Sequence, residues 1–310
     1  MKKRLTKELI ITVIISVVVI LAVLYVGRFV ILKDNFNTTK EISGKANPME
    51  FNNKFTIFFF HDGYKDKQSF SPNKTEATKA VNLFKATLEL IEPFKSLSPV
   101  IETRIFTTGE NECNVKMVSG KKRLMCNSRV FKAIDDLNIS NYKIVVLSPL
   151  EFDTYSDYAK GKNSAIYIST YKGKLDPSQF KRWMGIIFSQ ELGHSLGLFY
   201  EDEKPIAKDL LEDSFGPPNC APDLTSAKKW WGTSSTQFFR GCGGSNNYYY
   251  PEKGTLMSDL PSKESYGKIS EDYLRGVLTC FYANQKSAIL STGEISCDTL
   301  KKEYPNFWKE

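Results

Sequence analysis

Residues 188–203 read FSQELGHSLGLFYEDE, and this stretch decides the fold that the sequence predicts. The apolar residues leading into it recur at spacings of three and four, which predicts one broad apolar face on a helix beginning near Ser178. These residues are Phe180, Trp183, Met184, Ile187 and Phe188. Gln190, Glu191 and His194 continue the face, and positions 190 and 194 lie one turn apart. Polar side chains that point into a core need partners, and a metal ion is one such partner.

The spacing of these polar residues matches part of a zinc-binding pattern. Two ligands at i and i+4, with a glutamate beside the first, give H-E-x-x-H, in which the glutamate is the general base. Glu191 and His194 fit this pattern, and Gly197 stands where the longer form H-E-x-x-H-x-x-G-x-x-H has its glycine. A glycine there permits a sharp turn that returns the chain with a third ligand. Gln190 occupies the position of the first histidine, and Tyr200 occupies that of the third.

A second motif lies downstream, and the two together resemble a known family. Residues 254–258, GTLMS, resemble the Met-turn that underlies the zinc site of metzincin-clan peptidases. Within that clan, the chain is most similar to the IgA-protease-like metallopeptidases. The similarity covers roughly residues 165–282 and rests on short segments that agree in order and spacing. They are Pro218-Asn219-Cys220, Trp230-Trp231-Gly232, Gly241-Cys242, Tyr249-Tyr250-Pro251 and Leu256-Met257.

The resemblance implies a fold and a set of site residues. The fold is a metzincin-like α/β catalytic domain, with a mixed twisted sheet, a long active-site helix and an irregular C-terminal subdomain stapled by disulfides. In such peptidases the helix histidines and a later side chain bind zinc, and the glutamate activates water. Transferred position by position, Glu191 is the catalytic base and His194 a metal ligand, while Gln190 and Tyr200 stand at altered ligand positions.

Three functional hypotheses follow. The first is an active zinc metalloendopeptidase, with zinc as cofactor, Glu191 as general base, and Tyr200, Glu201 or Asp202 as a further ligand. The second is a pseudopeptidase that keeps the fold to bind a protein or peptide, with weak or absent zinc-dependent proteolysis. The third, an accidental E-x-x-H, is disfavoured because the Met-turn motif accompanies it. Since a glutamine amide is a poorer zinc ligand than imidazole, the altered positions favour the pseudopeptidase.

The N-terminal residues predict attachment to a membrane. Residues 1–8 are basic, and residues 9–32 begin with a charge-free apolar run, 9–27, that is long enough to span a bilayer core. The basic flank favours a cytoplasmic N-terminus, and the end of the run shows no A-x-A-like cleavage site, which favours an uncleaved anchor. Residues 33–53 are polar and are expected to form a tether. We therefore expect a single-pass protein of the cell membrane whose metallopeptidase-like domain, residues 54–310, lies outside the cytoplasm.

The charge distribution argues against nucleic acid as a partner. The first 32 residues hold five basic residues and one acidic residue, so about +4 of the net charge of +7 lies there. The modest excess in the rest of the chain lacks the concentrated basic patch that nucleic-acid binding usually needs.

Six cysteines all lie within residues 54–310, and an even number in an exported domain predicts disulfides. The sequence does not choose among the possible pairings, and we prefer nearest neighbours because each bond then closes one local loop. The pairs are Cys113 with Cys126, Cys220 with Cys242, and Cys280 with Cys297. Zinc ligation by thiolates is disfavoured, since no C-x-x-C pair is present.

The remaining periodicity predicts strands that alternate with helices before the long helix, and hence a mixed α/β sheet. The predicted strands are 55–60, 100–106, 144–147 and 165–169, the predicted helices are 75–94, 129–137 and 270–281, and 113–126 is a hairpin that turns at Ser119-Gly120. Residues 213–262, rich in glycine and proline, are expected to form loops. His61 ends the first strand and is interpreted as structural.

Overall fold

The chain divides into two compact units, residues 1–39 and 40–310. The computed structural model describes residues 54–62, 76–106, 112–137, 139, 141–156, 165–171, 176–199, 201, 218–232, 237–242, 245–258 and 261–303. All of these belong to the second unit, and the predicted anchor and tether lie outside them. Within these ranges no helix is both long enough and apolar enough to cross a membrane.

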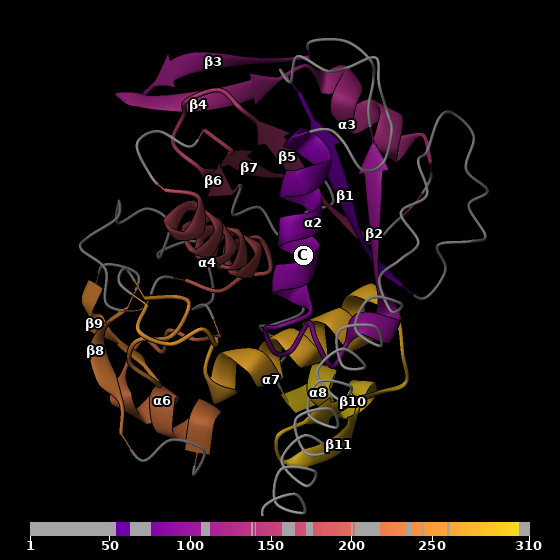
Figure 1. Ribbon diagram of the computed structural model, residues 1–310. Coiled ribbons are helices and arrows are strands. Elements are labelled where there is room, and N and C mark those ends of the chain that lie inside the picture. Colours follow the sequence, from indigo (N-terminus) through magenta and orange to yellow (C-terminus); the bar gives the residue numbers. More distant parts are fainter. Residues whose placement is uncertain are drawn as a thin grey trace, which may run out of the picture. The chain divides into compact units, whose positions relative to one another are not determined.

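A five-stranded sheet forms the centre of the second unit (Figure 1). Its strands lie in the order β2-β1-β5-β7-β6, and all neighbours run parallel except β6, which is antiparallel to β7. Their bounds are β1 Phe55–His61, β2 Ile101–Phe106, β5 Tyr142–Ser148, β6 Tyr155–Ser156 and β7 Ala165–Ser169. The prediction of a mixed α/β sheet is confirmed, and the four predicted strands lie where the sequence indicated.

The first strand is buried on both faces. Phe55, Ile57 and Phe59 pack on one side of the sheet, whereas Phe58 and Phe60 pack on the other. All five are at most 1% exposed. A parallel strand that is covered on both sides needs apolar residues at successive positions, and the sequence FTIFFFH supplies them.

Two helices cover one face of this sheet. They are α2 (Glu76–Leu88) and α4 (Pro177–Ser195), which Figure 1 shows in front of the strands. They contribute to one apolar core with that face, and the rings of Phe84 and Phe188 meet there with their centroids 4.6 Å apart. The long helix that contains the predicted site is therefore fixed to the sheet by aromatic packing.

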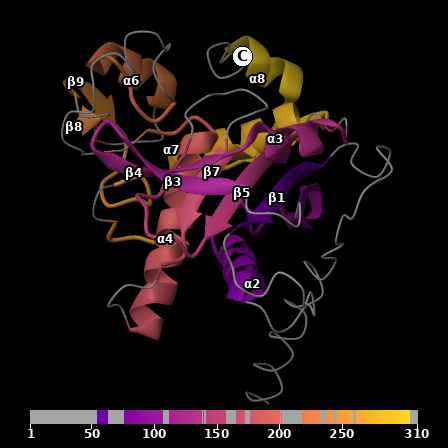
Figure 2. The same cartoon turned by 90° about the horizontal axis from the view of Figure 1, so that it is seen from above.

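The opposite face packs against a helix and a hairpin (Figure 2). The helix is α3 (Ser128–Asp135), and the hairpin consists of β3 (Cys113–Val118) and β4 (Lys121–Cys126). The hairpin turns at the predicted residues, Ser119 and Gly120, whose φ angles are 50° and 78°. Two successive positive φ values are what a tight two-residue hairpin turn requires, and they explain why small residues occupy these positions.

The segment predicted to be a loop, residues 213–262, contains regular structure, so that prediction is wrong in part. The described residues there include α6 (Leu224–Trp231), β8 (Phe239–Cys242) and β9 (Ser245–Tyr250). Aromatic side chains, Phe239 and Tyr250 among them, pack against Cys220 and Cys242 and stabilise these short strands. Glycine and proline content alone therefore underestimates the order of this segment.

The last predicted helix, 270–281, is present in a modified form. It begins as α7 (Lys268–Gly276) and continues as a π-helix (Val277–Tyr282). Three short elements follow that the sequence pattern did not predict: β10 (Ser287–Leu290), β11 (Gly293–Ser296) and α8 (Cys297–Glu303).

Disulfides join the cysteines as nearest neighbours, so the preferred pairing is confirmed. Cys113–Cys126 closes the base of the β3–β4 hairpin, Cys220–Cys242 ties β8 to the segment before α6, and Cys280–Cys297 ties the π-helix to α8. Each bond closes a loop of 13 to 22 residues. Two of the three disulfides lie in the part of the chain that follows α4.

Candidate functional site

Helix α4 begins at a capped N-terminus. The carboxylate of Asp176 accepts hydrogen bonds from the backbone N–H groups of Ser178 and Gln179, at 2.8 and 3.0 Å, and Pro177 fills the first helical position. The Ser178 hydroxyl also donates to this carboxylate, and these hydrogen bonds lower the pKa of Asp176. The predicted start near Ser178 is thus correct to within one residue.

The second half of α4 is buried on all sides, which differs from the single apolar face that the sequence predicts. Every residue from 188 to 196 is buried, whereas Trp183, predicted to lie on that face, is 41% exposed. The cause is that a second layer of chain, which includes Met257 and Tyr266, packs on this half of the helix. Tyr266 belongs to that layer, and its hydroxyl donates a hydrogen bond to the carbonyl of Ser189.

The predicted Met-turn lies directly against α4. Gly254 has a φ of 69°, and its carbonyl accepts hydrogen bonds from the N–H groups of Ser262 and Lys263 at 3.1 and 2.8 Å, so the chain folds back sharply. Met257 is fully buried, and a β-carbon on Gly193 of α4 would lie 2.7 Å from its sulfur. The two motifs that suggested the family resemblance therefore pack on each other, and a glycine in the helix permits the close approach.

Gln190 joins the helix to this turn. Its side-chain nitrogen donates a hydrogen bond of 2.8 Å to the backbone carbonyl of Ser258, and both residues are buried. A buried carbonyl needs a donor, because leaving it unsatisfied costs free energy. Gln190, which stands at the position of the first histidine, thus connects by a hydrogen bond two segments that are 68 positions apart.

His194 is held as a neutral imidazole. It is 1% exposed, and its Nδ1 lies 2.9 Å from the carbonyl oxygen of Leu198. Because a carbonyl only accepts, Nδ1 is the protonated nitrogen and the lone pair of the neutral ring lies on Nε2. Burial lowers the pKa of His194 to about 4, although the hydrogen bond to Leu198 opposes the shift. The ring is therefore uncharged at neutral pH.

The chain reverses at Gly197, as predicted. The φ of this glycine is 100°, and its N–H donates a hydrogen bond of 2.9 Å to the carbonyl of His194, which ends the helix. Tyr273 packs against the turn, and its hydroxyl donates a hydrogen bond of 2.7 Å to the Leu196 carbonyl. A β-carbon on Gly197 would lie 2.8 Å from that hydroxyl oxygen, so both the backbone and the packing select glycine.

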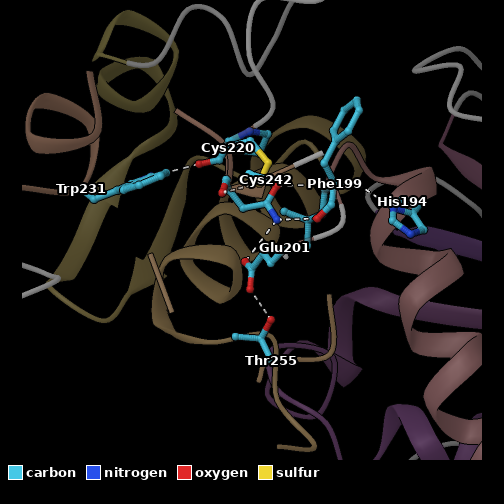
Figure 3. The surroundings of a disulfide bond; sticks show 10 residues. His194, Phe199, Glu201, Cys220, Trp231, Cys242 and Thr255 are labelled. Carbon is cyan, nitrogen blue, oxygen red and sulfur yellow. Dashed lines mark hydrogen bonds between the residues drawn. A yellow bond between two sulfur atoms is a disulfide. The ribbon is translucent and has the colours of Figure 1, made fainter. Parts of the chain in front are cut away.

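Beyond the turn, Glu201 belongs to a buried hydrogen-bond network (Figure 3). One of its carboxylate oxygens accepts from the amide of Asn219 at 3.2 Å, and the other accepts from the hydroxyl of Thr255 at 2.5 Å. Asn219 also clasps the backbone of Phe199, accepting from its N–H at 2.9 Å and donating to its carbonyl at 2.7 Å. Figure 3 shows Glu201 directed toward Thr255, while His194 lies apart on α4. Both oxygens of Glu201 thus already have donors.

Asn219 and Thr255 were not predicted from the sequence as partners of Glu201. Both lie in the segments that carry the family resemblance, and the available signal was a short polar side chain close to a motif residue: Asn219 directly precedes Cys220, and Thr255 lies two residues before Met257. Of the other predicted ligand positions, Tyr200 and Asp202 lie outside the described residues. Glu191 lies on α4 and is 7% exposed, so it is buried with its neighbours.

The described residues do not fit a zinc site. Zinc in proteins takes at least three nitrogen, sulfur or oxygen ligands from side chains such as histidine, cysteine and carboxylates. In the part of the chain that the structure describes, no group of three such residues is placed to hold a metal ion. All six cysteines are in disulfides. His61, the second histidine, ends β1 and pairs in register with Leu147.

Comparison with known proteins leaves the family open. No protein-family model and no curated protein matches the chain. Among solved structures, the chain is similar to archaemetzincin from Methanopyrus kandleri, with 11% sequence identity and a TM-score of 0.30. The likeness covers 52% of this chain and 85% of that one. A likeness of this size concerns the fold at most and assigns no function.

Proposed function

We propose that residues 54–310 form a metallopeptidase-like domain that binds a protein or peptide and has weak or absent zinc-dependent proteolysis. In this proposal the domain is of metzincin type, nearest to the IgA-protease-like metallopeptidases. It is a pseudopeptidase in which the former site has become part of the core. Residues 9–32 anchor it in the cell membrane, and the domain lies outside the cytoplasm.

The hydrogen bond from Gln190 to the Ser258 carbonyl is the observation that supports this proposal best. A side-chain amide nitrogen has no lone pair to offer a metal, and here it is engaged by the backbone of the Met-turn. The carboxylate of Glu201, the first described acidic residue after the Gly197 turn, accepts two hydrogen bonds of its own. The geometry therefore supports a helix and turn joined by hydrogen bonds in place of a metal.

Restoring the histidines tests the proposal. Gln190→His together with Tyr200→His should raise zinc binding sharply, because the helix spacing and the turn at Gly197 are present. Glu191→Ala in that background should abolish any new hydrolysis and leave the zinc bound. A double-histidine variant that folds, as judged by circular dichroism, and still binds no zinc would contradict the metzincin assignment.

A second candidate is an active zinc endopeptidase with unusual ligands. One observation favours it: the hydrogen bond to Leu198 holds His194 in the tautomer whose Nε2 bears the lone pair, as a metal ligand requires. Stoichiometric zinc in the wild-type chain would support this candidate over the pseudopeptidase.

The membrane topology has its own test. Protease added to intact cells should digest the domain, because the basic residues before the apolar run favour a cytoplasmic N-terminus. A domain that is protected until the cells are lysed would contradict the proposed topology without bearing on the site.

A further inference from the structure

The hairpin of β3 and β4 ends in a tip that is both apolar and basic. At the tip, Met117 is 65% exposed and Val118 is 45% exposed; Met125, also 45% exposed, lies near the base of the hairpin opposite Asn114. Figure 1 shows the hairpin above the sheet, with its strands reaching further to the left than the edge strand β6. Exposed apolar side chains gathered in one place usually mark a contact surface.

The exposed apolar side chains lie on both faces of the hairpin. Cross-strand partners share a face, and successive residues alternate between faces. Met117 lies opposite Lys122, and Val118 lies opposite Lys121, so the two apolar residues at the tip point to opposite sides. A flat protein surface would cover only one of these two faces. A lipid interface would surround the tip and contact both Met117 and Val118.

The charge of the hairpin is of one sign. Residues 113–126 contain Lys116, Lys121, Lys122 and Arg123 and no acidic residue. Two of these cations are engaged within the domain: Lys122 pairs with Glu151 at 3.1 Å, and the Arg123 guanidinium lies 4.2 Å from the centre of the Tyr155 ring. The backbones of Lys116 and Lys121 pair within the hairpin, whereas their side chains are exposed and make no hydrogen bond or ion pair with another described residue.

The hairpin is held rigid behind its tip. The Cys113–Cys126 disulfide joins its two ends, and the carbonyl of Leu124 accepts a 2.7 Å hydrogen bond from the hydroxyl of Tyr155. The side chain of Leu124 is fully buried in the core on that face of the sheet. The exposed tip is thus presented on a fixed base and needs no folding step to make a contact.

We propose that this tip docks on an anionic lipid surface. Met117 and Val118 enter the interface, while Lys116 and Lys121 lay their methylene stems along it and place their ammonium groups among lipid phosphates. Each lysine near an anionic bilayer strengthens attachment by about fivefold. The inference uses the contacts of the hairpin alone, so it rests neither on the altered zinc site nor on the predicted anchor.

Tryptophan quenching in the full-length chain tests the docking. Val118→Trp places a fluorophore at the tip, and Leu90→Trp places one at a site that is 74% exposed elsewhere in the domain. Emission is measured relative to the parent chain in vesicles whose lipids bear bromine on the acyl chains. We expect quenching of the tip probe in vesicles rich in phosphatidylglycerol, little in pure phosphatidylcholine, and none for the Leu90 probe. The two variants differ only in the position of the added tryptophan. Attachment of the chain to the vesicle through another segment would therefore not by itself quench the tip probe more than the Leu90 probe.

Charge removal provides the matched control. Lys116→Gln with Lys121→Gln should weaken contact of the tip with anionic lipid by about 25-fold, at about fivefold for each lysine. Lys301→Gln with Lys302→Gln removes the same charge from exposed positions on α8 and should leave the quenching unchanged. A tip probe that is unquenched in anionic vesicles would overturn the proposal. That result is expected if the hairpin binds a peptide strand and not lipid. Equal quenching in neutral vesicles would overturn it as well.

Discussion

The side-chain amide of Gln190 and the backbone carbonyl of Ser258 form a buried hydrogen bond of 2.8 Å between the long helix α4 and the turn that contains Met257. In the zinc-binding pattern a histidine would occupy position 190 and face a metal. Here the side chain faces the backbone of the turn and satisfies one of its carbonyls. The same contact explains how the helix and the turn stay together and why a glutamine is suited to this position.

Removing the amide should destabilise the domain. Gln190→Ala leaves the Ser258 carbonyl buried without this donor, so the free energy of unfolding should fall by about 1–3 kcal/mol. Gln179→Ala, at an exposed position on the same helix, is the control and should change it by less than about 0.5 kcal/mol. Chemical denaturation of the full-length chain measures both, and equal small effects would show that the hydrogen bond contributes nothing.

The close approach of Met257 to α4 predicts a cost for a single methyl group. Gly193→Ala would place a β-carbon 2.7 Å from the Met257 sulfur and 2.9 Å from a ring carbon of Tyr266. Overpacking of this kind typically costs about 1–3 kcal/mol, although alanine is otherwise the better helix former. In a Met257→Ala background the cost should shrink by about 1 kcal/mol, which a double-mutant cycle measures. A Gly193→Ala variant as stable as the parent would contradict the packing described.

The turn at Gly197 allows the backbone and packing effects to be separated. Alanine at a left-handed position costs roughly 1–2 kcal/mol from the backbone alone. Gly120→Ala should show only this cost, since a β-carbon added there in the hairpin turn would have no atom within 4 Å. Gly197→Ala should cost more, because of the Tyr273 hydroxyl oxygen at 2.8 Å. Tyr273→Phe removes that oxygen. In this background, Gly120→Ala and Gly197→Ala should lower the free energy of unfolding by the same amount, as measured by chemical denaturation.

The sequence predicted the parts of the fold that depend on local pattern. The apolar run at 55–60, the small residues at Ser119-Gly120 and the glycine at 197 each impose a conformation on their own segment, and all three are found as expected. Nearest-neighbour disulfides were also predicted correctly, because each pair closes a short loop. These features need no knowledge of distant contacts.

The features that the sequence did not predict depend on contacts between distant segments. Trp183 satisfies the helical period but lies beyond the layer that covers the second half of α4, so it is exposed. Gln190 satisfies a ligand spacing, yet its partner lies 68 positions away in the backbone of another motif. The strands of the segment 213–262 are stabilised by aromatic packing and a disulfide, which composition does not reveal. Spacing therefore indicates candidate positions, and contacts between distant segments decide what the residues at those positions do.

The carboxylate of Glu201 should be a major determinant of stability. Glu201→Ala leaves the buried donors of Asn219 and Thr255 without their acceptor, and we expect a loss of about 3 kcal/mol or more. Glu264→Ala breaks a surface ion pair with Arg182, whose side chain is 70% exposed, and should cost at most about 1 kcal/mol. Thermal unfolding of the two variants would reveal the contrast. Similar melting temperatures would mean that the buried network is not formed.

The metal content of the wild-type chain tests the central claim most directly. The full-length protein is purified without chelators, equilibrated with zinc, freed of unbound metal and analysed by inductively coupled plasma mass spectrometry. Because Gln190 is engaged by Ser258 and Glu201 by Asn219 and Thr255, we predict far less than one zinc ion per chain and little or no hydrolysis of generic peptides. One zinc ion per chain, together with peptide hydrolysis that is lost in Glu191→Ala, would contradict the pseudopeptidase and establish an enzyme with unusual ligands.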